Sequence, residues 1–97
     1  MHPIYQIKSF KAIDDFVLSI KFDDSSEQII DFYPILSGEL YGALRDLIVF
    51  NRVSIDPEVN TLVWSNGADF DPDTLHDWPV YEQAWKDRAK QWDLRAA

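Results

Sequence analysis

The clearest pattern in the chain is an alternation of apolar and largely polar positions along Phe16–Phe22. Every second residue of this stretch is a large apolar one, which is typical of a β-strand with one face on a core and the other in water. Turn-forming residues follow at 24–26, and residues 27–33 resume an extended pattern rich in β-branched and aromatic side chains. Residues 15–33 are therefore predicted to form an antiparallel hairpin, and residues 4–10 a strand before it.

The middle of the chain predicts a short helix and a second hairpin. Pro34 ends the preceding strand because proline cannot donate to a β-ladder. Helical spacing then connects four apolar residues, Leu40, Ala43, Leu44 and Leu47, while residues 46–50 form either the last turn of this helix or a separate turn. Alternation at residues 52–56 and a turn at 56–60 predict a hairpin that ends with Thr61–Trp64, and Asn60 suits the left-handed conformation that such a turn needs.

The segment Thr61–Leu75 connects this hairpin to the helical end of the chain. A short apolar strand ends at Trp64, and Asn66-Gly67 favours positive φ, which lets the chain reverse or leave the sheet. Asp71-Pro72 then predicts a helix start, with Asp71 as the N-cap, Pro72 at the first helical position and Leu75 directed inward.

A last helix is predicted from Pro79 to about Leu94, with its basic residues towards its C-terminal end. The elements together predict an α+β fold: a small antiparallel sheet of about five short strands in two hairpins, a short inserted helix and a C-terminal helix. We expect residues 1–97 to form a single domain, with a core at 4–77 and the helix at 78–95.

Composition and charge narrow the classes of function. The 97 residues carry 17 acidic and 9 basic side chains, and the net charge of −8 repels phosphate backbones and anionic lipid. Direct binding of nucleic acid is therefore disfavoured, whereas a basic protein partner is compatible. The chain has no cysteine, which excludes disulfides, thiolate catalysis and cysteine-ligated zinc. No apolar run is long enough to cross a membrane, so a bacterial, cytoplasmic location is expected.

Three stretches of the sequence, FDDSSEQIIDFYPIL, VSIDPEVNTLVW and WSNGADFDPDTLH, resemble a known family. They are similar to the small bacterial family called domain of unknown function 2442, and the resemblance covers residues 4–77. It implies an α+β domain of few strands with a helical segment between two hairpins, and it implies no established activity. Some relatives carry a helix-turn-helix after this domain, and some lie beside genes of toxin–antitoxin or other regulatory type. Only residues 78–97 remain here, too few for a helix-turn-helix, so that DNA-binding role is not carried over.

The alternating aspartates of the last stretch, Asp69, Asp71 and Asp73, have the spacing of the first ligands of a calcium loop. The comparison fails further on, because the glycine and glutamate that such a loop needs are replaced by Thr74 and Val80. Capping and turn formation explain these aspartates better. A divalent-metal site made by the three aspartates and His76 stays as the alternative.

Catalysis has little support in the sequence. His76 lies beside Asp73 and Asp77, and Ser65 or Thr74 could supply a hydroxyl, but no spacing requires a nucleophile, a base and an orienting group to meet. The glycines are isolated and form no phosphate-binding loop. We therefore assign no catalytic residue, no metal ligand and no cofactor.

The last helix carries an aromatic stripe, because Trp78, Trp85 and Trp92 repeat every seven residues and Tyr81 follows the first by three. The stripe is expected either to pack on the sheet as core or to form an interface with a partner or a second copy of the chain, since tryptophan and tyrosine are favoured interface anchors.

Two hypotheses of function follow. The first is a non-enzymatic protein-interaction module, an antitoxin-like or regulatory partner. The alternative is a small-ligand- or metal-binding domain. Residues named for possible binding are those of the distinctive segment: Trp64, Asn66, Gly67, Asp69, Asp71, Asp73 and His76.

Overall fold

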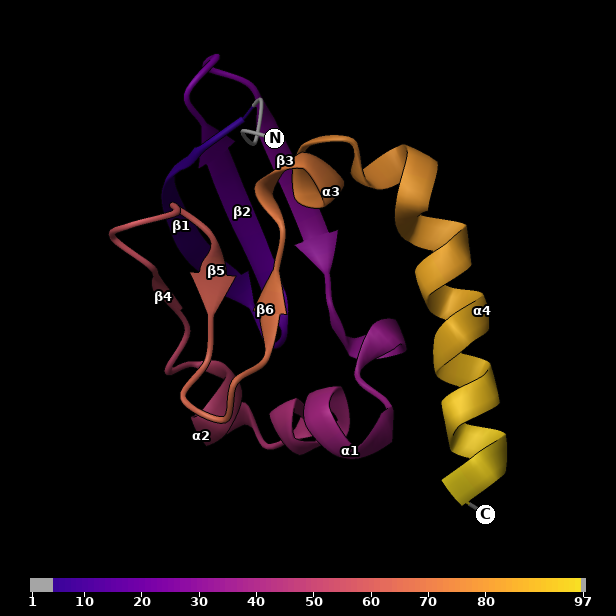
Figure 1. Ribbon diagram of the computed structural model, residues 1–97. Coiled ribbons are helices and arrows are strands. Elements are labelled where there is room, and N and C mark those ends of the chain that lie inside the picture. The colour runs from indigo at the N-terminus through magenta and orange to yellow at the C-terminus, as the bar shows by residue number, and fades with distance from the viewer. Residues whose placement is uncertain (1–4, 97) are drawn as a thin grey trace.

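The computed structural model describes residues 5–96, which form two three-stranded antiparallel sheets and several helices (Figure 1). The first sheet has the order β1 (Ile7–Asp14), β2 (Val17–Phe22) and β3 (Glu27–Asp31). The second sheet is β4 (Ser54–Ile55), β5 (Leu62–Val63) and β6 (Asp69–Phe70). The α+β class and the antiparallel pairing are confirmed.

Residues 5–96 contain six strands in two sheets, whereas about five strands in one sheet are predicted from the sequence. The missed strand is β6, which pairs back on β5 through Val63 opposite Asp69. The Asn66-Gly67 turn therefore reverses the chain within the sheet. A strand of two residues shows no measurable alternation, so its sequence gave no sign of it.

The first strand is longer and later than predicted. It was expected over residues 4–10, of which Ile4 lies outside the described part, and it runs instead to Asp14, which pairs with Val17. The predicted inner face of β2 is confirmed for Leu18, Ile20 and Phe22, which are all fully buried. Phe16, the first residue of the predicted alternation, instead lies in the turn before β2 with a φ of 62° and is only partly buried.

The segment after η1 (Tyr33–Ile35) is predicted as a short helix, with residues 46–50 as its last turn or as a separate turn. The structure divides the segment into separate turns, which confirms the second alternative for 46–50. These are α1 (Gly38–Tyr41), η2 (Gly42–Arg45) and α2 (Leu47–Phe50). Asp46 causes the second break, because its backbone is extended and its carboxylate accepts the N–H of Ile48 as an N-cap. The predicted apolar face is only partly right: Leu44 is buried, whereas Leu40 and Ala43 are exposed.

Two helices end the chain, α3 (Pro72–His76) and α4 (Trp78–Ala96). In Figure 1, α3 lies at one end of the sheets, the turns α1 and α2 lie at the other end, and α4 runs along one side. Side chains from both sheets meet in one core, where the rings of Phe32, Phe50 and Phe70 surround Trp64. The indole N–H of Trp64 donates to the carbonyl of Phe50 at 2.9 Å, so this buried polar group is satisfied.

Candidate functional site

The turn at Asn66-Gly67 is fixed by local hydrogen bonds. Gly67 has a φ of 94°, a conformation that glycine adopts without steric cost. The Asn66 side chain accepts the N–H of Ala68 at 3.0 Å and donates to the carbonyl of Leu40 at 3.0 Å. Trp64, Asn66 and Gly67 therefore serve the hairpin and its contact with α1.

The three alternating aspartates have separate structural positions. Asp71 caps α3 by accepting the N–H of Asp73, with Pro72 in the first turn, so the predicted helix start is confirmed. Asp73 accepts the backbone N–H of Tyr5 at 3.1 Å. Asp69 lies on β6 with an exposed side chain. Within residues 5–96, no three histidine or carboxylate side chains gather as metal ligands would.

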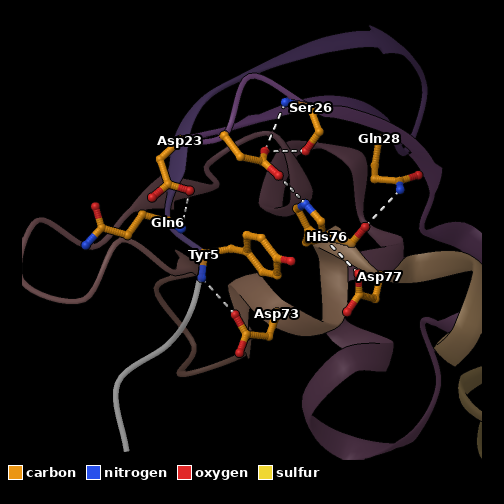
Figure 2. A network of polar contacts seen from close by, with 9 residues as sticks. Tyr5, Gln6, Asp23, Ser26, Gln28, Asp73, His76 and Asp77 are labelled. Carbon is orange, nitrogen blue, oxygen red and sulfur yellow. Dashed lines mark hydrogen bonds and ion pairs between the residues drawn. The ribbon is translucent and has the colours of Figure 1, made fainter.

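His76 is the centre of the polar network in Figure 2, at the C-terminal end of α3. Its Nδ1 lies 2.8 Å from Oδ1 of Asp77, and its Nε2 lies 2.8 Å from Oδ2 of Asp24 in the turn between β2 and β3. An ionised carboxylate only accepts hydrogen bonds, so this geometry favours the imidazolium form of His76, in which both ring nitrogens donate.

The imidazolium is also enclosed by aromatic rings. Tyr5 stacks on it with centroids 3.5 Å apart and nearly parallel planes, and Phe22 meets it edge-on. Gln28 on β3 donates to the His76 carbonyl at 2.9 Å. His76 therefore joins the N-terminal segment, the turn between β2 and β3, and α3, with only 15% of its own side chain exposed.

The pKa directions agree with this geometry. Burial lowers the pKa of His76, but the hydrogen bonds that the ring donates to Asp77 and Asp24 outweigh this effect, so the pKa is raised above its ordinary value. Hydrogen bonds from the Ser26 hydroxyl and N–H, followed by that from His76, lower the pKa of Asp24 to about 2. Both shifts favour an ion pair between the protonated His76 ring and the ionised Asp24.

The same geometry limits the chemistry available to His76. A general base needs a free ring nitrogen directed at the proton that it removes, and both nitrogens are occupied by carboxylates. Ser26 bonds to Asp24 rather than to His76, so the hydroxyl and the imidazole do not form a nucleophile–base pair.

The aromatic stripe of α4 faces its own core for most of its length. Trp78 is buried, Trp85 contacts the ring of Phe70, and Trp92 stacks on Tyr41. Tyr81 differs from the three tryptophans because 42% of it is exposed.

Sequence reasoning identified His76 but not three of its partners: Tyr5, Asp24 and Gln28. These residues are far from it along the chain, and Asp24 is separated from it by 52 positions. Nothing in the spacing signals such a contact. The sequence predicts Asp24 only as part of a turn, and Asp24 does form that turn by accepting the N–H of Ser26.

No helix in the described part of the chain has the length and apolar character of a membrane span.

Comparison with known proteins places the chain in a family. No curated protein and no solved structure matches the sequence. The model of a family described as "Protein of unknown function (DUF2442)" matches residues 7–80, which include both sheets, α3, and His76 with its carboxylate partners Asp24 and Asp77. The chain therefore belongs to the DUF2442 family.

Proposed function

We propose that this protein is a non-enzymatic interaction module of the bacterial cytoplasm, an antitoxin-like or regulatory partner that binds a basic protein. The observation that carries the proposal is an acidic end, which we define as Asp23, Asp24, Asp73 and Asp77. These carboxylates come from the turn between β2 and β3 and from the α3 region. Asp24 and Asp77 contact His76, and Figure 2 labels Asp23, Asp73 and Asp77 in the surrounding network.

The acidic end is both fixed and accessible. Asp24 and Asp77 are bonded to His76, yet 41% and 48% of their side chains are exposed. Asp23 accepts the N–H of Gln6 at 3.1 Å. Carboxylates held in place lose little side-chain entropy on binding, and the net charge of −8 favours encounter with a positive surface.

Apolar anchors lie next to this end at the start of α4. Val80 is 76% exposed and Tyr81 is 42% exposed, and the N–H of Val80 donates to the carbonyl of Asp77. Exposed tyrosine beside charged groups is a frequent composition of protein interfaces. The occupied ring nitrogens of His76 further support binding rather than catalysis.

The test is co-expression with the product of the neighbouring gene, followed by an affinity measurement at low and high salt. We expect a complex that weakens as salt rises, because exposed charges are screened. Tyr81→Ala should weaken it by about tenfold. Ile48→Ala is the matched control, since Ile48 is also exposed but lies on α2 at the opposite end (Figure 1). Absence of a complex at low salt, or equal losses in both variants, would contradict the proposal.

A further inference from the structure

The first sheet has two edge strands that differ in how they are protected. β1 carries the irregularities and charges that usually prevent strand addition: register shifts near both of its ends and the exposed lysines Lys8 and Lys11. β3 has a regular register against β2, with no bulge, no proline and no lysine. Strand addition is thus hindered at the β1 edge of the sheet but not at the β3 edge.

The backbone of β3 directs alternate residues to its free edge. The N–H of Phe22 donates to the carbonyl of Ser26, and the N–H of Phe32 donates to the carbonyl of Phe16, so the even-numbered residues from 26 to 32 bond to the β2 side. The N–H and C=O groups of Glu27, Ile29 and Asp31 consequently point away from β2. Among residues 5–96, no strand pairs with that side of β3.

The side chains along this edge favour one kind of added strand. Ile29 is 66% exposed, and it lies between the exposed carboxylates of Glu27 and Asp31. In an antiparallel pairing of two copies centred on Ile29, Glu27 would lie opposite Asp31, and like charges directly opposite are destabilising. A strand with basic residues two positions either side of an apolar one would instead place opposite charges against each carboxylate.

We propose that the free edge of β3 accepts an extended segment of a partner protein by β-strand addition, with the pattern basic, any residue, apolar, any residue, basic. Backbone bonds to Glu27, Ile29 and Asp31 supply affinity, and the two carboxylates select the sequence. This inference rests on the proposed function, since it specifies how the basic partner binds. The edge continues directly from the acidic end, because Glu27 follows the turn that contains Asp24.

The direct test uses the capped peptide TKTITKT as the probe, with TETITET as the acidic control, titrated into the ¹⁵N-labelled full chain. We expect saturable shift changes at the amides of Glu27, Ile29 and Asp31 with the basic peptide and none with the acidic one. Ile29→Pro removes an outward N–H and should weaken binding by about tenfold or more. Ala12→Pro on β1 is the matched control and should bind as the wild type does. Circular dichroism of each variant checks that it is folded before the titration.

Charge reversal keeps the inference testable if Ile29→Pro fails to fold. The double variant Glu27→Lys and Asp31→Lys should prefer TETITET to TKTITKT. No binding of the basic peptide, shift changes confined to other elements, or unchanged preference after charge reversal would each overturn strand addition at β3.

The two proposals fail in different ways with the neighbouring gene product. If that product binds Ile29→Pro as tightly as the wild type and remains salt-sensitive, strand addition is wrong while the interaction module stands. If it does not bind the wild type at all, the proposed function fails, whereas the peptide titration still decides the chemistry of the edge.

Discussion

Replacing Trp85 with alanine measures how firmly α4 is attached to the sheets. Trp85 lies in the middle of the aromatic stripe, partly buried against the core. Its ring is 5.1 Å from that of Phe70 and meets Tyr41 edge-on at 5.5 Å. Arg88 covers its outer face at 5.1 Å. The substitution would remove all of these contacts from one side chain.

The size of the loss follows from the buried area. A tryptophan buries about 150–250 Å² when it is enclosed, and a partly buried one about 100–150 Å², worth about 2.5–4 kcal/mol at 25 cal/mol per Å². Fully buried tryptophans cost about 3–5 kcal/mol on truncation to alanine. We expect Trp85→Ala to lower the free energy of unfolding by about 3 kcal/mol, or the melting temperature by about 12–24 °C for a domain of this size.

The assay is unfolding followed by far-UV circular dichroism, with the molecular mass measured by light scattering. Val80→Ala is the control on the same helix, and it should change stability by no more than about 0.5 kcal/mol because Val80 is exposed. A melt of Trp85→Ala close to that of the wild type would refute the reasoning. If an oligomer were lost at the same time, the stripe would belong to an interface instead.

Four further outcomes are expected. The pKa of His76 is raised on folding, so its contribution to stability is complete below its unfolded pKa of about 6.5 and is lost as pH rises through the raised value. The difference in urea unfolding between wild type and His76→Gln should therefore be largest below about pH 6.5 and shrink as the pH rises above it. Ser25→Gly should raise stability by about 0.5–1 kcal/mol in the same assay, because Ser25 has a φ of 72°. Gly38→Ala should lower the melting temperature more than Gly67→Ala: both glycines have positive φ, but only at Gly38 would the new Cβ lie 3.3 Å from the Trp92 ring. Calcium, magnesium, manganese or zinc at ~1 mM should leave the melting temperature unchanged, whereas a shift would support the metal-binding alternative.

The sequence predicts the local backbone conformation correctly where the chemistry of a single residue decides it. Asn60 was assigned to the left-handed region and has a φ of 56°. Asp71 and Pro72 were assigned to a helix start, and Leu75 to the core, where it is fully buried. Each of these conformations is set by interactions within one turn of the chain, so tertiary packing does not change it.

Competition between neighbouring signals explains the broken helix. The spacing of four apolar residues over 40–47 favoured one continuous helix, but Asp46 offers the backbone a cap in place of the next helical bond. Leu44 alone of the four is fully buried, so packing would not have restored the continuous form. Over so few residues, helical spacing of apolar side chains stabilises a continuous helix less than the Asp46 carboxylate stabilises a new helix start.

The His76 network could not have been read from the sequence, because its geometry depends on where the β2–β3 turn lies relative to α3. That turn is set locally, since Asp24 accepts bonds from Ser26, and α3 is set locally by its Asp71 cap. Only the packing of the first sheet against α3 brings the β2–β3 turn next to α3. The His76 ring then bonds to Asp24 in the turn and to Asp77 at the end of α3. The bonds that hold this turn also fix the residue before Glu27, where β3 begins. The acidic end and the free edge of β3 are therefore positioned by one network, and a partner that uses both would meet a surface already arranged before binding.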